Sequence, residues 1–219
     1  MIRENLKKIL EQLPDGVQLV GAVKTRTTEE IIEAIDAGLK IIGQNYVQEA
    51  EKIFQAIGTR TKHHLIGHLQ SNKAKKAVNI FDMIETVDSE KLARAINNAC
   101  QSIGKVMPVL LEINSGEEPQ KAGIMPADFF SLIEQISEYE NISIQGLMTM
   151  GPFSGNPEDA RPYFQKTRQL FEQAKRLNIR NIRMEYLSMG MSNSFKVAIE
   201  ESANLVRIGT AIFGERDYD

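Results

Sequence analysis

The chain has 219 residues, 42% of them hydrophobic, so it is long enough to bury a substantial core. Its formal net charge of −3 excludes the generally basic surface that nucleic-acid-binding domains present. A single cysteine, Cys100, excludes an internal disulfide, and no apolar run approaches the roughly 18 residues that a membrane span needs, so we expect a cytoplasmic protein.

Short β-branched runs alternate with longer segments of helical period along the whole chain. Strands are predicted at residues 18–23, 40–43, 63–66, 83–86, 106–113, 142–148, 183–187 and 204–208. Helices are predicted at residues 4–12, 28–37, 47–57, 73–79, 89–103, 126–138, 156–177 and 192–200. Strands separated by helices form parallel sheets, because parallel neighbours need crossovers. The order therefore predicts a single (β/α)8 barrel domain over residues 1–219, preceded by an extra helix.

Polar side chains follow the first three predicted strands directly. Lys24 comes after the first strand, Asn45 after the second and His68 after the third. Functional sites of such barrels lie at the carboxyl ends of the strands, so these side chains are expected on one face. An open dinucleotide-binding sheet would instead carry a Gly-x-Gly-x-x-Gly turn where this chain has Lys24 to Thr27. A lysine at this position can lose its proton and attack an aldehyde, although most lysines are simply solvated.

Small and hydroxyl-bearing residues follow the last two predicted strands. Gly190 and Ser192 come after the seventh strand, and Gly209 and Thr210 come after the eighth. Barrels of this kind often hold a phosphate at these two loops, where backbone amides and hydroxyls can approach an anion. Ser192 and Gly190 could equally be a helix cap and a simple turn. Together with Lys24, the two loops favour a phosphorylated aldehyde as the ligand.

Several longer motifs resemble those of the pyridoxal-phosphate homeostasis protein family, also called the YggS or PROSC family. They lie at residues 22–25, 43–49, 64–73, 121–123, 146–150, 187–192 and 206–214. This resemblance implies a barrel like the amino-terminal domain of alanine racemase, with pyridoxal 5'-phosphate (PLP) held as a Schiff base on Lys24. It further implies the remaining cofactor-binding residues, which are Asn45 in the pocket, Ser188 and Met189 as wall residues, Ser192 with Gly209 and Thr210 at the phosphate, and Arg207 at the pyridine nitrogen.

The resemblance implies a carrier of PLP with no established reaction, which buffers the cofactor, delivers it transiently to apoenzymes and affects amino-acid and keto-acid balance indirectly. A guanidinium such as that of Arg207 disfavours a protonated pyridine nitrogen and makes the cofactor a weaker electron sink. After residue 208 we expect no racemase-like second domain, so a tyrosine would have to supply the second base that racemization needs. The candidates are Tyr46, Tyr163, Tyr186 and Tyr218. We therefore favour a monomeric carrier over the alternative, an amino-acid racemase of weak or narrow activity.

Three positions depart from the usual family pattern, namely Val23, Gln44 and Ser194. The last two stand where acidic residues are usual, so they remove negative charge near the predicted pocket. We expect them to alter the affinity for PLP rather than the identity of the ligand.

Three histidines, His63, His64 and His68, suggest a metal site at first sight, but they lack the spacing of a zinc helix. Successive side chains of a strand point to opposite faces, so His63 and His64 cannot both enter the barrel. We expect no metal. The basic cluster of Lys73, Lys75 and Lys76 lacks interleaved aromatic residues and is interpreted as a solvated helix face.

Overall fold

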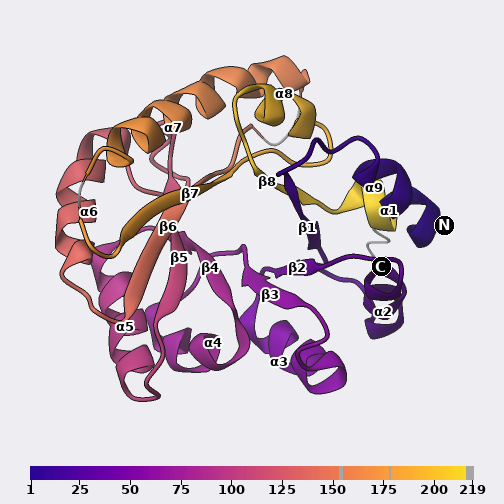
Figure 1. The fold of residues 1–219 in the computed structure, drawn as a ribbon, viewed down its shortest axis with the longest axis horizontal. Helices are drawn as coiled ribbons and strands as arrows, with labels where there is room; N and C mark the ends of the chain where they lie inside the picture. The colour runs from indigo at the N-terminus through magenta and orange to yellow at the C-terminus, as the bar shows by residue number, and fades with distance from the viewer. Residues whose placement is uncertain (153–154, 178, 216–219) are drawn as a thin grey trace.

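A computed structural model describes residues 1–152, 155–177 and 179–215. Eight parallel strands close into a barrel in chain order, and helices surround it (Figure 1). The strands are β1 (Gln18–Ala22), β2 (Ile41–Gln44), β3 (Lys62–Leu65), β4 (Met83–Val87), β5 (Met107–Ile113), β6 (Ile142–Thr149), β7 (Ile182–Ser188) and β8 (Leu205–Ile208). Pairing of β8 with β1 closes the barrel, with Leu205 opposite Gln18. The predicted fold is confirmed, and every predicted strand is present within two residues of its expected bounds.

The helices follow the predicted order, with short 3-10 turns (η) at the start of three of them. They are α1 (Ile2–Leu10), α2 (Thr28–Asp36), α3 (Val47–Ile57), η1 (Ser71–Lys73), α4 (Ala74–Ile80), α5 (Glu90–Gln101), η2 (Pro126–Asp128), α6 (Phe129–Ser137), η3 (Pro157–Ala160), α7 (Arg161–Ala174), α8 (Phe195–Glu200) and α9 (Thr210–Phe213). The extra helix α1 lies against α2 and α9 and buries Ile2, Leu6 and Ile9.

One predicted helix boundary is wrong in a way that matters for the site. The helix expected to start at Ser192 begins at Phe195. The hydroxyl of Ser194 accepts a hydrogen bond from the backbone N–H of Met191 at 3.2 Å, which closes a turn ahead of the helix. Ser192 therefore lies in a loop and not in the first helical turn. The four-residue helix α9 was not predicted.

Side chains alternate between the inside of the barrel and the layer under the helices, as the strand period requires. In β8, Val206 and Ile208 belong to an outer hydrophobic cluster, whereas Leu205 packs inside the barrel. Val20, Met83 and Leu110 pack with Leu205 in the interior. Arg207 falls on the same face as Leu205, two residues nearer the carboxyl end. The apolar lower part of the barrel thus supports a polar upper layer beneath the site.

Candidate ligand-binding site

The ends of β1 and β2 place Lys24 and Asn45 next to each other at the mouth of the barrel. The backbone N–H of Val23 donates to the carbonyl of Gly43 at 3.0 Å, so the two strand ends are paired up to this point. Lys24 is half-buried, and its Nζ lies 5.5 Å from the centroid of the Tyr46 ring. At this distance the ring face attracts the ammonium group. Lys24 also borders a cavity of about 490 Å³ between α2 and α3, which Gln44 borders too.

A glycine brings the end of β3 against the end of β2. A Cβ at Gly67 would lie 2.4 Å from the backbone oxygen of Asn45, a contact that no side chain permits. Asn45, Tyr46, Gly67 and His68 consequently line one cavity of about 410 Å³. The ends of the second and third strands thus meet at one cavity, whereas Lys24 borders the neighbouring cavity between α2 and α3.

The loops after β7 and β8 meet at the hydroxyl of Ser192. Its Oγ accepts hydrogen bonds from the backbone N–H of Gly209 at 3.3 Å and from that of Ala211 at 3.4 Å. Gly190 makes the approach possible, because its φ is +89° and a Cβ there would lie 2.8 Å from the Cα of Phe195. A hydroxyl and two backbone amides thus gather at one point, where such donors suit an anion. Thr210 follows Gly209 as the first residue of α9 and is exposed.

Inside the barrel, Arg207 is the centre of a buried polar network. Its Nη1 donates to the Ser188 hydroxyl at 2.5 Å, and its Nη2 donates to the carbonyl of Thr149 at 2.8 Å. Ser188 in turn donates to Oε2 of Glu85 at 2.7 Å, and Nδ1 of His64 donates to Oε1 of Glu85 at 2.7 Å. All five residues are at most 5% exposed. The network connects strands β3, β4, β6, β7 and β8.

Two buried carboxyl groups respond differently to this environment. Burial opposes ionisation of Glu85, but hydrogen bonds from His64 and Ser188 and attraction by His64 and Arg207 hold its pKa below the usual range. Glu112 has no such set of donors. Burial and the nearby negative charge of Asp88 raise the pKa of Glu112 to about 7, although Arg207 opposes the shift. Near neutral pH, Arg207 therefore has one fully ionised carboxylate as its counter-charge.

Glu112→Gln is expected to change how stability depends on pH. The folded chain keeps a proton on Glu112 up to a pKa of about 7, whereas the unfolded chain releases it near the ordinary value of 4.5. Stability therefore falls as pH rises through this window, by up to roughly 3 kcal/mol. The variant lacks this loss, so its stability relative to wild type should be higher at pH 8 than at pH 5. Urea unfolding at both values checks this, and a difference that does not vary with pH would contradict it.

The predicted wall residues Ser188 and Met189 do not face an open space. Ser188 is fully buried as the bridge between Arg207 and Glu85. The side chain of Met189 is also fully buried, in the hydrophobic cluster outside the strands. The structure therefore assigns Ser188 to the layer beneath the mouth, and it leaves Met189 no side-chain surface for a ligand. Of the predicted site residues, the remaining six lie at or directly beneath the mouth, namely Lys24, Asn45, Ser192, Arg207, Gly209 and Thr210.

The histidines separate as the strand period predicts. His64 points into the barrel toward Glu85, whereas the ring of His63 lies outside, 5.3 Å from that of Phe54 in α3. His68 is exposed near Asp88, with 3.5 Å between Nδ1 and Oδ2. Among residues 1–152, 155–177 and 179–215, no three or more His, Cys, Asp or Glu side chains gather as metal ligands do.

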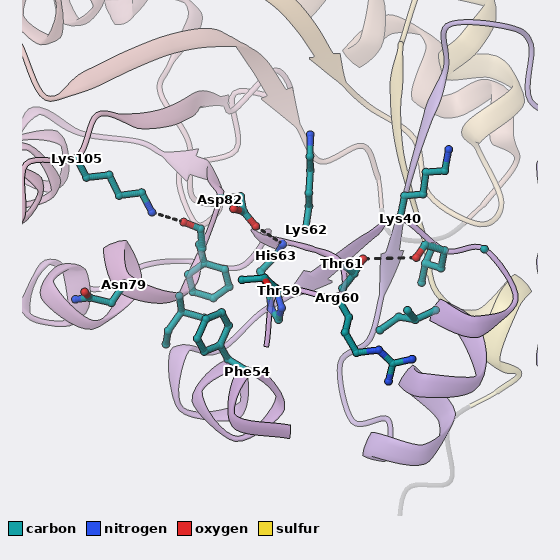
Figure 2. Close-up of a pocket in the computed structure, with 15 residues that line it drawn as sticks. Lys40, Phe54, Thr59, Arg60, Thr61, Lys62, His63, Asn79, Asp82 and Lys105 are labelled. Carbon is teal, nitrogen blue, oxygen red and sulfur yellow. Dashed lines mark hydrogen bonds between the residues drawn. The ribbon is translucent and has the colours of Figure 1, made fainter. Parts of the chain in front are cut away.

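A further cavity, of about 540 Å³, lies at the opposite, amino-terminal ends of β2, β3 and β4 (Figure 2). Its rim is basic, with Lys40, Arg60, Lys62 and Lys105. Two of these cations already have partners. Arg60 pairs with Asp36 at 2.6 Å, and Lys105 donates to two backbone carbonyls at the end of α4. This cavity is a weaker candidate than the barrel mouth, where lysine, arginine and backbone donors converge.

Sequence reasoning missed Glu85, Glu112 and Thr149 as parts of the site. The signal was present, because Glu85 and Glu112 each stand inside an apolar strand run, where an acid is almost always buried with a partner. Thr149 contributes only its backbone carbonyl to Arg207, so its side chain gave no indication.

Comparison with known proteins identifies the family. Residues 1–217 match the alanine racemase N-terminal domain. A pyridoxal phosphate homeostasis protein of Vibrio alginolyticus is 36% identical over 99% of this chain and 98% of its own length. One of Aquifex aeolicus is 44% identical over 71% of this chain and 67% of its own length. The chain belongs to the pyridoxal phosphate homeostasis protein family. The predicted resemblance is thereby confirmed.

Solved structures agree with this family assignment. PipY of Synechococcus elongatus, a homologue solved with PLP bound, superposes with a TM-score of 0.90 at 34% identity. The match covers 98% of this chain and all of PipY. Alanine racemase of Clostridium difficile superposes with a TM-score of 0.83 at 17% identity, over all of this chain and 57% of the racemase, which shows a shared fold. Within the described residues, no helix of this family member is long and apolar enough to span a membrane.

Proposed function

We propose that this protein binds pyridoxal 5'-phosphate and takes part in PLP homeostasis in the cytoplasm, where it buffers the cofactor and delivers it to apoenzymes. The observation that carries the proposal is the meeting of an amine, a buried guanidinium and a cluster of anion donors around one barrel mouth. PLP is an aldehyde, a pyridine and a phosphate in one molecule, and each of these groups has a matching partner here. The PLP-bound homologue from Synechococcus supports the same ligand.

The residues present fit the cofactor. Lys24 would hold its aldehyde carbon as a Schiff base, and Tyr46 would cover the lysine amine from one side. The Ser192 hydroxyl with the amides of Gly209 and Ala211 would hold the phosphate. Arg207 would face the pyridine nitrogen and keep it unprotonated. When bound, PLP supplies an electrophilic carbon for amines, and the protein supplies the groups that orient it and exclude water.

Borohydride reduction of the protein loaded with PLP, followed by peptide mass spectrometry, tests the proposal. Reduction converts a Schiff base into a stable secondary amine, so a pyridoxyl group should be found on the peptide that contains Lys24. Absence of the group from this peptide at full loading would overturn the proposal.

Carriage is favoured over racemization by the positions of the tyrosines. Racemization needs a second base across the substrate carbon from the lysine. Tyr46 lies beside Lys24 and not opposite it. Tyr163 packs on α7 against the loop at Gly116, and Tyr186 is partly buried among the barrel interior residues. Tyr218 lies outside the described residues.

We expect the protein loaded with PLP to leave the α-proton of L-amino acids in place. The reason is that none of the tyrosines among the described residues is placed as a second base across from Lys24. Proton NMR in deuterated water, with a panel of L-amino acids and a bacterial alanine racemase as positive control, measures the exchange. Exchange at rates typical of racemases would establish the alternative function.

A monomer is expected in sedimentation experiments, because the residues that would hold the aldehyde, the phosphate and the ring nitrogen all come from one barrel.

A further inference from the structure

The buried chain of hydrogen bonds from His64 through Glu85 and Ser188 to Arg207 has a defined direction. Glu85 is ionised, so both of its oxygen atoms can only accept hydrogen bonds. The proton of the Ser188 hydroxyl must therefore point to Glu85 Oε2, and His64 must carry its proton on Nδ1. This leaves the lone pairs of the Ser188 oxygen facing Arg207, whose Nη1 donates to them at 2.5 Å. The charge of Glu85 thus sets the orientation of every group up to the guanidinium.

Arg207 depends on this chain for its position. Its guanidinium is planar and fully buried, and it is fixed by Ser188 on one nitrogen and by the Thr149 carbonyl and the Met150 sulfur on another. The contacts to Thr149 and Met150 both involve Nη2, so by themselves they would let the guanidinium group rotate about this nitrogen. The contact from Nη1 to Ser188 removes this freedom, because two separate nitrogens are then fixed. A planar fork with two fixed nitrogens has one orientation.

We propose that Glu85 is a positioning residue for Arg207, acting through Ser188 to hold the guanidinium against the ligand at the barrel mouth. The inference rests on the proposed function, in which Arg207 faces the pyridine nitrogen of PLP. Glu85 itself does not reach the mouth, since its side chain is fully buried and both of its oxygen atoms are used by His64 and Ser188.

Glu85→Gln and Ser188→Ala test the proposal, because each breaks the chain at a different link with a near-isosteric change. The glutamine side chain at position 85 has one acceptor oxygen and one donor nitrogen. Either Ser188 or His64 must therefore accept a hydrogen bond from it instead of donating one. With Arg207 displaced, the ring nitrogen of bound PLP takes up a proton more readily. We expect both variants to move the midpoint of the pH-dependent absorbance change of bound PLP upward by about one pH unit, and to weaken PLP binding about tenfold.

Glu201→Gln is the matched control. Glu201 is another buried carboxylate, 5% exposed and held by Arg161 and Arg168 on the outside of the barrel. We expect its replacement to perturb folding but to leave the network around Arg207 intact, so the absorbance midpoint should stay at the wild-type value. Circular dichroism and measurement at 10 °C ensure that folded protein is compared.

The outcomes separate the two proposals. If wild-type protein gives no pyridoxyl group on Lys24 after reduction, the proposed function fails. If wild type is labelled on Lys24 while folded Glu85→Gln and Ser188→Ala both keep its absorbance midpoint and affinity, the positioning role of Glu85 is overturned and the function stands. A midpoint that moves in Glu201→Gln by the same amount would also overturn it, since the effect would then reflect general destabilisation.

Discussion

Lys24→Ala is expected to abolish covalent loading with PLP. Wild-type protein mixed with PLP should turn yellow and, after reduction with borohydride, gain one pyridoxyl group per chain. The variant should remain colourless after gel filtration and gain none, because Lys24, at the end of β1, is the amine that would hold the aldehyde. Absorbance spectra and intact-mass measurements check both results.

Lys52→Ala is the matched control for this experiment. Lys52 borders the same cavity as Lys24 but is exposed on α3. Its replacement tests whether any lysine near the mouth can react, and full loading of this variant is expected. Equal loading of Lys24→Ala and wild type would refute the assignment of the Schiff base, and a loss in Lys52→Ala as well would point to a nonspecific amine.

Arg207→Met is expected to destabilise the folded protein by about 3–5 kcal/mol at pH 8, because removing one partner leaves a buried charge without compensation. Glu85 would lose the cation that helps to keep it ionised, and Ser188 would lose its donor. The midpoint of urea unfolding should fall accordingly. Arg161→Met serves as the control, because Arg161 is partly exposed and partly exposed pairs contribute little. Its one buried partner, Glu201, keeps a second cation in Arg168.

The sign of the pH dependence adds a second test of this prediction. In wild type the lowered pKa of Glu85 contributes stability above its ordinary range, and this contribution is lost as pH falls. Without Arg207, Glu85 is protonated at higher pH in the folded state, and a neutral carboxyl needs no cation. The stability difference between wild type and Arg207→Met should therefore be smaller at pH 5 than at pH 8. A double variant, Arg207→Met with Glu85→Leu, should recover much of the loss.

Local sequence rules predicted the fold well because each element satisfies them independently. The capping box at α2 is an example, in which Thr27 accepts from the backbone N–H of Glu30, and the Glu30 carboxylate accepts from that of Thr27. The misplaced helix start at Ser192 has the opposite cause. A serine and an asparagine resemble an N-cap, but the turn is closed by the Ser194 hydroxyl and by the positive φ of Gly190, which periodicity does not encode.

The mouth of the site was predictable, whereas the layer beneath it was not. Lys24, Asn45, Ser192 and Gly209 follow directly from the rule that functional residues come after barrel strands. The partners of Arg207 come from β4, β6 and β7, up to 122 positions away along the chain, as with Glu85. The alternation of residues along a strand predicts whether each side chain lies inside or outside the barrel. Which interior side chains of different strands contact one another depends on the register of all eight strands.

The long hydrogen bonds of Ser192 bear on how easily the protein can give up what it holds. At 3.3 and 3.4 Å, the two contacts from the amides of Gly209 and Ala211 exceed the usual range of about 2.7–3.2 Å. The Ser192 hydroxyl is therefore a weak acceptor for these two amides. An anion that binds here would replace the Ser192 hydroxyl as the acceptor of the two amides. When the anion leaves, the amides can return to the hydroxyl, so neither N–H group is left without an acceptor. Compared with a loop whose amides have no acceptor, we expect this loop to gain less free energy when an anion binds and to lose less when the anion leaves. This behaviour suits a reversible store rather than a permanent prosthetic group.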